Sequence, residues 1–215
     1  IKGTGSQQDA QTDCGLGNIV ISSDPPYYDN IGYADLSDFF YIWLRRSLKN
    51  IYPQLFRTML VPKAEELVAT SYRFGGSREK ARDFFEDGMA QACRQFYRYA
   101  REDVPVTIYY AYKQSESDED GNTAQASTGW ETMLSAIIKA GFAITGTWPM
   151  RTEKPGRSIE IETNALTSSI VLVCRKRPDD APTCTRRTFI SGLKHELHTA
   201  LKKLQSSNIA PVDMA

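Results

Sequence analysis

Hydrophobic residues follow two different periods along this chain, and together these predict a mixed α/β domain. Short apolar runs, typical of buried strands, occupy 19–22, 104–112, 142–148 and 169–176. Apolar residues recur every three or four positions, as on one face of a helix, at 35–51, 77–101, 130–140 and 185–205. Because strand and helix patterns largely alternate, we expect a single α/β domain over 1–215.

The predicted helices carry further signals at their ends and on their faces. Ser77 stands where an N-cap residue is expected, and Gly141 follows the third helix as a terminating glycine. The apolar stripe of the first helix has the spacing of a buried face, so we interpret it as part of the core. This stripe consists of Leu36, Phe39, Phe40, Trp43, Leu44, Leu48 and Ile51.

Two long connections interrupt the periodic pattern. Residues 52–77 have no steady period, and a connection of this length is uncommon in a compact domain. We expect a lid or a binding loop there, with disorder as the alternative. Residues 115–127 are acidic and rich in small residues, a composition typical of a mobile loop.

Composition narrows the classes of function. Lysine plus arginine equals aspartate plus glutamate, so any nucleic-acid contact must come from a local basic patch. The four cysteines lack the paired spacing of a zinc site, so we expect no metal and a reduced, cytoplasmic environment. No apolar run approaches the ~20 residues of a membrane-spanning helix, so no membrane partner is expected.

Candidate chemistry follows the first predicted strand directly, in Asp24-Pro25-Pro26-Tyr27. Two consecutive prolines cannot continue a central strand, so they form a stiff loop whose carbonyls lack neighbouring N–H donors. In an open α/β sheet, ligands bind beyond the carboxyl ends of the strands. There, Asp24 and the Pro25 carbonyl could accept hydrogen bonds from the exocyclic NH2 of a base, while Tyr27 stacks on its ring.

The Asp-Pro-Pro-Tyr sequence resembles the catalytic motif of S-adenosylmethionine-dependent amino-methyltransferases, above all N6-adenine DNA methyltransferases. The longer run 23–31, with Trp43-Leu44-Arg45-Arg46, resembles the large bacterial and archaeal adenine-specific DNA methylases that carry DUF1156. The resemblance implies a Rossmann-like fold, with this chain as the second half of the sheet and an antiparallel hairpin at its end. It also implies DNA as substrate and S-adenosylmethionine as cofactor.

The resemblance assigns roles to the residues of the motif. Asp24 and Pro25 would orient and polarise the amine, Pro26 would hold the loop, and Tyr27 would stack the base. The approach to the site would be lined by Tyr28, Asp29, Asn30 and Tyr33. An RNA adenine, an N4-cytosine or a protein amide remains open as target, and the recognition sequence, biological role and oligomeric state are not predicted. A non-catalytic nucleic-acid-binding or assembly module with the same fold is the alternative.

The cofactor side of the expected site has weak sequence support. Related enzymes place a glycine-rich loop after their first strand, but Gly3-Thr4-Gly5 and Gly15-Leu16-Gly17 lack a strand before and a helix after. Asp9 is the candidate for an acid near the adenine end of the cofactor. We therefore expect this chain to be a fragment, with the missing remainder of the parent chain holding the main cofactor loop and continuing past 215.

A basic segment separates the last two predicted strands. Its cations are Arg151, Lys154 and Arg157, which we expect to contact phosphates or a base edge of DNA. The alternative is an ordinary solvated loop, because Glu153, Glu160 and Glu162 would neutralise the cations.

Overall fold

The structure is a computed structural model, and it describes residues 2–28, 31–110, 128–151 and 168–206. Within these residues the chain is a mixed α/β protein with four α-helices and a four-stranded mixed sheet, as the sequence predicts. The elements in chain order are β1 (Ser22–Ser23), α1 (Tyr33–Leu48), the 3-10 turn η1 (Ser71–Phe74), α2 (Arg78–Tyr99), β2 (Val106–Tyr110), α3 (Thr128–Lys139), β3 (Phe142–Arg151), β4 (Ser168–Lys176) and α4 (Arg186–Ser206). The predicted loop at 115–127 lies outside the described residues.

The sheet has the strand order β1-β2-β4-β3. β1 pairs parallel to β2, whereas β4 is antiparallel to both of its neighbours. It follows that β1, β2 and β3 all run in one direction, and their carboxyl ends share one edge of the sheet. The predicted strand at 19–22 is shorter and later than expected, because regular pairing is confined to the two residues before the Asp24-Pro25-Pro26 turn. Ile19 forms an isolated bridge with Ala100.

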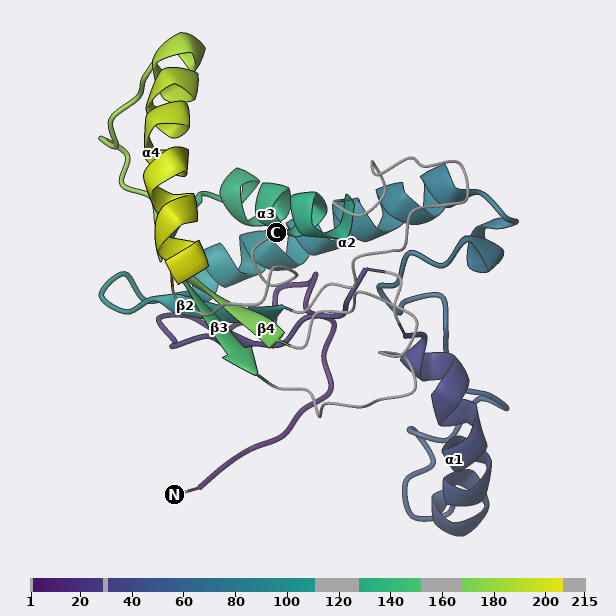
Figure 1. Cartoon of the computed structure of the whole chain (residues 1–215). Helices are drawn as coiled ribbons and strands as arrows, with labels where there is room; N and C mark the ends of the chain where they lie inside the picture. The colour runs from purple at the N-terminus through teal and green to yellow at the C-terminus, as the bar shows by residue number, and fades with distance from the viewer. Residues whose placement is uncertain (1, 29–30, 111–127, 152–167, 207–215) are drawn as a thin grey trace.

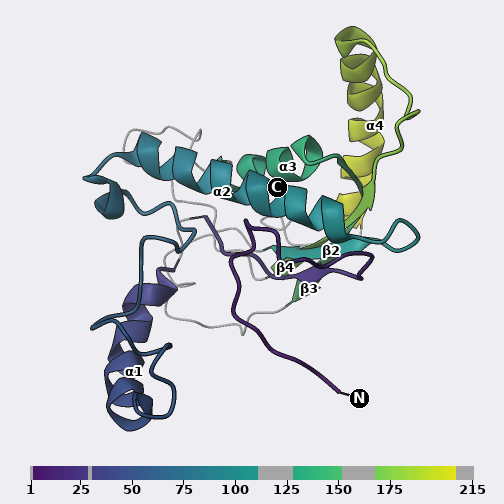
Figure 2. The same ribbon diagram turned by 180° about the vertical axis from the view of Figure 1, so that it is seen from behind.

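Helices α2 and α3 lie side by side on one face of this sheet (Figures 1 and 2). β2 buries alternate residues, as a strand with one covered face does. The core between sheet and helices is contiguous, and its largest fully buried side chains include Tyr110, Phe85, Phe142, Met89, Ile108, Met133, Ile137 and Leu172. Burial of this apolar surface holds the two helices on the sheet.

Both predicted helix-end signals are confirmed. The Ser77 hydroxyl accepts a hydrogen bond from the Lys80 amide at 3.2 Å and caps α2. Gly141 lies directly between α3 and β3 with a φ of +103°, a backbone conformation that residues other than glycine rarely adopt. The chain can therefore leave α3 and enter β3 within a very short connection.

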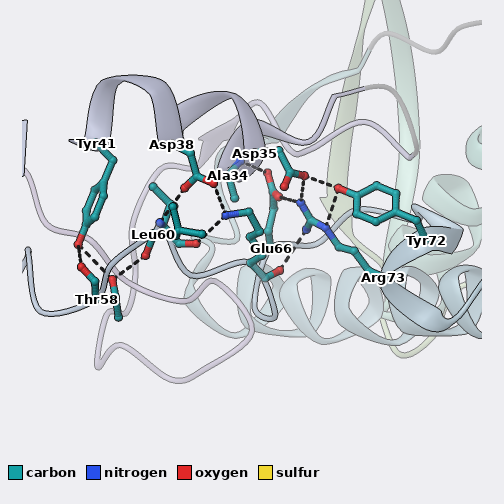
Figure 3. Close-up of polar contacts among 11 residues, drawn as sticks. Ala34, Asp35, Asp38, Tyr41, Thr58, Leu60, Glu66, Tyr72 and Arg73 are labelled. Atoms are coloured by element: carbon teal, nitrogen blue, oxygen red, sulfur yellow. Dashed lines mark hydrogen bonds and ion pairs between the residues drawn. The ribbon is translucent and has the colours of Figure 1, made fainter. Parts of the chain in front are cut away.

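Helix α1 corrects the sequence interpretation of its apolar stripe as core. Leu36, Phe39, Phe40, Trp43, Leu44 and Ile51 are 48–67% exposed, and Leu48 is half-buried. The helix stands apart from the sheet (Figure 1). Its opposite face contacts residues 56–73, the segment that we call the strap, through polar groups (Figure 3). The periodicity located an amphipathic helix correctly, but spacing alone cannot show which face turns inward.

A second exposed apolar strip lies on α4. Phe189, Leu193 and Leu197 of this helix are each at least half exposed. No helix among the described residues combines the length and apolar character needed to cross a membrane.

We predict that Gly141→Ala destabilises the protein by about 2 kcal/mol or more. An added Cβ would lie 2.8 Å from the Tyr97 ring. That ring is in turn held between Phe142, with centroids 5.3 Å apart, and the Lys176 ammonium. Urea denaturation followed by circular dichroism measures the change.

Gly75→Ala is the matched control, because Gly75 also has a positive φ of +64° but nothing within 4 Å of an added Cβ. Its cost should be limited to backbone strain, about 1 kcal/mol. If the two variants lost equal stability, the close packing of Tyr97 would not be the reason for glycine at 141.

Candidate active site

The turn after β1 places an acid at the carboxyl edge of the sheet. Asp24 is exposed, Pro25 is buried and Pro26 is exposed, so the turn is anchored by one proline and presents its acid outward. Hydrogen bonds between described residues do not use the Pro25 carbonyl oxygen. An exposed carboxylate next to a carbonyl without a donor is a pair of acceptors, the arrangement expected for an NH2 ligand.

Tyr27 turns back toward the acid of its own motif. Its hydroxyl donates to Asp24 Oδ1 at 3.4 Å, and its half-buried ring lies edge-on to Tyr110 with centroids 5.7 Å apart. Burial, followed by the negative charge of Asp24, raises the pKa of Tyr27 above its ordinary value. The phenol therefore keeps its proton at neutral pH and can serve as a donor to the carboxylate.

Tyr110, at the end of β2, joins the motif to helix α3. This buried ring stacks on Trp130 with centroids 6.0 Å apart, and its hydroxyl donates to the Gly129 carbonyl at 3.3 Å. Neither Tyr110, Trp130 nor Gly129 was expected at the site. A usable signal was present, because the carboxyl ends of parallel strands meet at one edge and Tyr110 lies near the end of the predicted strand 104–112.

Tyr28 packs inward among the helices. Its ring lies edge-on to Phe85 of α2, with centroids 5.1 Å apart. An added Cβ at Gly129 would lie 3.0 Å from Tyr28 Cβ, so glycine permits the first turn of α3 to approach the motif. The Tyr28 carbonyl accepts the Ala69 amide at 2.7 Å, which ties the strap to the site. Its role in lining the approach stays a prediction.

The other residues predicted to line the approach are only partly described. Tyr33, the first residue of α1, is 57% exposed. It lies near enough to Tyr27 to contribute to the raised pKa of that phenol. Asp29 and Asn30 lie outside the described residues.

The strap binds α1 through a network of charged groups (Figure 3). The Arg73 guanidinium contacts Asp35 and Glu66, each at 2.7 Å, while the other Glu66 oxygen accepts the Ala34 amide at 3.0 Å. Hydrogen bonds from Tyr72 and then Arg73 lower the pKa of Asp35. Although burial opposes its charge, the hydrogen bonds to Asp35 and its neighbours raise the pKa of Arg73.

Asp38 makes a second attachment one turn further along α1. It accepts the Val61 amide at 2.9 Å and the Lys63 ammonium at 2.7 Å. The hydrogen bond from Lys63, followed by that from Val61, lowers the pKa of Asp38. Both acids of the helix are thus held by the strap, with Tyr41 adding a ring contact to Phe56.

The β3–β4 pair brings exposed apolar side chains to the same edge of the sheet. Tyr110 and Pro149 both pair with Ile170, one from each side of β4. Trp148 and Met150 are 66% and 46% exposed. Arg151 is the last residue of β3 at this edge, whereas Lys154 and Arg157 lie outside the described residues.

The two cofactor-side features predicted from the sequence, Asp9 and the N-terminal glycines, lie in the segment before β1. The exposed carboxylate of Asp9 accepts a hydrogen bond from the Gln11 amide at 2.9 Å and so stabilises a local turn. An added Cβ at each of four N-terminal glycines would meet no other atom of the chain within 4 Å, although Gly15 has a positive φ of +70°. These are Gly3, Gly5, Gly15 and Gly17, and all precede β1, the first strand of the described sheet.

Comparisons with protein-family models, curated proteins and solved structures found no match. The fold around the motif brings Asp24, Tyr27 and Tyr110 together, with α3 and the end of β3 at the same edge.

We predict that Arg73→Ala loosens the strap while the sheet stays folded. The change leaves two carboxylates without their shared cation, one of them on the largely buried Glu66 side chain. Hydrogen–deuterium exchange of the Ala69 amide should become at least about tenfold faster, because that amide is protected by its bond to Tyr28.

Arg82→Ala is the control, since the Arg82–Asp83 pair is half exposed on both sides and should contribute little. Unchanged exchange at Ala69 in the Arg73 variant would mean that the strap is held by its apolar contacts instead.

Proposed function

We propose that this chain provides the base-binding side of an S-adenosylmethionine-dependent methyltransferase acting on the N6 amine of adenine in DNA. The observation that carries this proposal is the exposed Asp24 carboxylate on a proline-fixed turn at the carboxyl edge of the sheet, beside the Tyr27–Tyr110 aromatic pair. An acid, a carbonyl to which no described residue donates, and aromatic rings together match the needs of a planar base with an amine.

The chemistry of the amine explains the need for an acid. The nitrogen lone pair of adenine N6 is delocalised into the ring, so it is a poor nucleophile. Hydrogen bonds from its two N–H groups to Asp24 and to the Pro25 carbonyl favour a pyramidal nitrogen with a localised lone pair. Pro26 keeps the turn rigid, because its ring fixes its own φ.

Tyr27 is suited to a dual role in this reaction. Its hydroxyl hydrogen bond to Asp24 orients the carboxylate, and its partly exposed ring offers apolar surface to an extruded base. Stacking of a base on an aromatic ring is typically worth ~1–3 kcal/mol. Tyr33 at the start of α1 would lie at the entrance, together with Asp29 and Asn30.

Contacts to DNA would lie along the edge formed by the end of β3. Trp148 and Met150 expose apolar surface there, and the cation Arg151 follows them in sequence. Lys154 and Arg157 would continue the basic segment. Exposed aromatic surface beside cations is the usual composition of a single-strand binding surface, and this chain has no net charge to attract DNA globally.

The sheet is compatible with the Rossmann-like fold implied by the sequence resemblance. β1 pairs parallel to β2, and the last two strands, β3 and β4, form an antiparallel pair at one side of the sheet. Asp9 holds a local turn in the structure, and its role near the adenine end of the cofactor stays a prediction. We propose a reducing, cytoplasmic location, in which free thiols such as Cys93 and Cys174 persist.

A non-catalytic assembly module is the second candidate, and a specific observation favours it. Helix α1 exposes an apolar face next to the site, as proteins that bind a partner do. The two functions are separated by the dependence of DNA binding on Asp24 and on the exocyclic amine. Binding that is weakened both by Asp24→Ala and by replacing the target adenine with purine supports the methyltransferase, whereas binding that neither change affects supports the module.

We predict that Asp24→Ala weakens adenosine binding about tenfold, because it removes a charge-assisted acceptor of the amine. Binding is measured by NMR, from chemical-shift changes of the Tyr27 ring during titration with adenosine. Purine riboside is the matched ligand, because it lacks the exocyclic amine. It should bind weakly to both proteins, and equal affinity of the unmodified chain for the two nucleosides would contradict the role of Asp24.

We also predict that Trp148→Ala weakens binding of a single-stranded oligonucleotide by about five- to a hundredfold, the loss of one stacked base. Fluorescence anisotropy of a labelled oligonucleotide measures the affinity. Phe189→Ala removes a ring of similar exposure, 59%, from α4 and is the control. An equal loss in both variants would indicate that binding does not use the β3 edge.

A further inference from the structure

The outward face of α1 is apolar over the length of the helix. We call Leu36, Phe39, Phe40, Trp43 and Leu44 the α1 apolar face, and each of these side chains is 48–67% exposed. The spacing of three and four residues places them along one stripe of the helix. Ser47 lies within the same stripe, and its hydroxyl donates to the Trp43 carbonyl at 3.1 Å, so this polar group can be buried without losing its partner.

The chain's own fold keeps this face turned outward. The opposite side of α1 carries Asp35 and Asp38, whose carboxylates pair with Arg73 and Lys63 of the strap at 2.7 Å. Rotating the helix to bury its apolar face against the sheet would break both ion pairs. Large aromatic side chains in water are therefore a fixed property of this fold, and a second surface is needed to cover them.

The exposed area matches that of a stable protein interface. Ile51, Tyr52 and Leu55 follow the helix and are also 52–64% exposed. At 150–250 Å² for each aromatic side chain, these residues and the α1 apolar face together expose on the order of 800 Å². A stable interface buries about 800 Å² on each partner, whereas monomers rarely expose apolar patches beyond a few hundred Å².

The charges at the two ends of α1 favour an antiparallel second copy of this helix as the partner. The first turn carries Asp35, whose side chain is 38% exposed despite its pairing, and the last turn carries Arg45 and Arg46. In an antiparallel pair of α1 helices, the exposed Arg46 of each copy lies toward the acidic first turn of the other, and the helix dipoles oppose favourably. A parallel pair would instead bring the two Arg46 side chains together.

We propose that the α1 apolar face is the interface of a two-fold symmetric homodimer in which the α1 helices of two copies pack antiparallel. The arrangement is self-complementary, because the aromatic centre of each helix meets that of the other and the aliphatic ends flank it. It concerns assembly and does not depend on the chemistry at Asp24. Dimerisation would place the two candidate sites on either side of one shared helical pair.

Sedimentation equilibrium of the full chain tests the dimer. We expect a dimer with a dissociation constant in the micromolar range or tighter. The double substitution Phe40→Glu with Trp43→Glu should weaken dimerisation by more than about a hundredfold, since it removes two central aromatic residues and adds like charges. Both positions are exposed, so the circular dichroism spectrum should change little.

The matched control is Phe189→Glu with Leu193→Glu, which charges the other exposed apolar strip, on α4, where the two side chains are 59% and 51% exposed. This variant should remain dimeric. A monomeric unmodified chain at high micromolar concentration would overturn the proposal and assign the face to a different protein or a lipid surface. Dimerisation that survives the α1 substitutions, or is lost only in the α4 variant, would also overturn it.

Discussion

The packing of Tyr110 is the interaction on which the candidate site depends. This fully buried ring meets Tyr27 from the turn after β1 and stacks on Trp130 of α3, while its hydroxyl holds the Gly129 carbonyl. Three segments that are distant in sequence therefore converge on one side chain. A buried tyrosine can do this because its ring supplies apolar contact and its hydroxyl satisfies a backbone group. Without this ring, Asp24 would not be held at a fixed position relative to α3.

The strap extends this arrangement to the surface of the molecule. Ala69 bonds to the carbonyl of Tyr28 at the site, and Arg73 and Lys63 neutralise the acids of α1. A polar attachment on one side of a helix leaves its apolar side to be covered from outside. The same ion pairs that position α1 beside the candidate site thus create the exposed surface of that helix. The proposed base-binding site and the proposed assembly surface are therefore adjacent in this chain.

The arrangement of the sheet gives the proposed nucleic-acid surface its position. Inserting β4 antiparallel between β2 and β3 keeps β3 parallel to β1, so the end of β3 and the Asp24 turn reach the same edge. A neutral chain can present a local site for an anionic polymer when its cations and aromatic rings are gathered at such an edge. The described part of that edge contains Trp148 and Met150, neither of which was singled out from the sequence.

The sequence by itself determined the kinds of element and the place of the motif. Periodicity depends only on local geometry, so it located the helices and strands within a few residues, and Ser77 and Gly141 marked their ends through backbone chemistry. The Asp24-Pro25-Pro26 turn was also readable, because proline fixes its own backbone. Tertiary structure alone decided the rest. The burial of Tyr110, the outward orientation of Phe40 and Trp43, and the capture of Asp35 by Arg73 all depend on partners distant in the chain. Spacing along a helix shows that one face is apolar, but only long-range contacts decide whether that face turns toward the core or toward solvent.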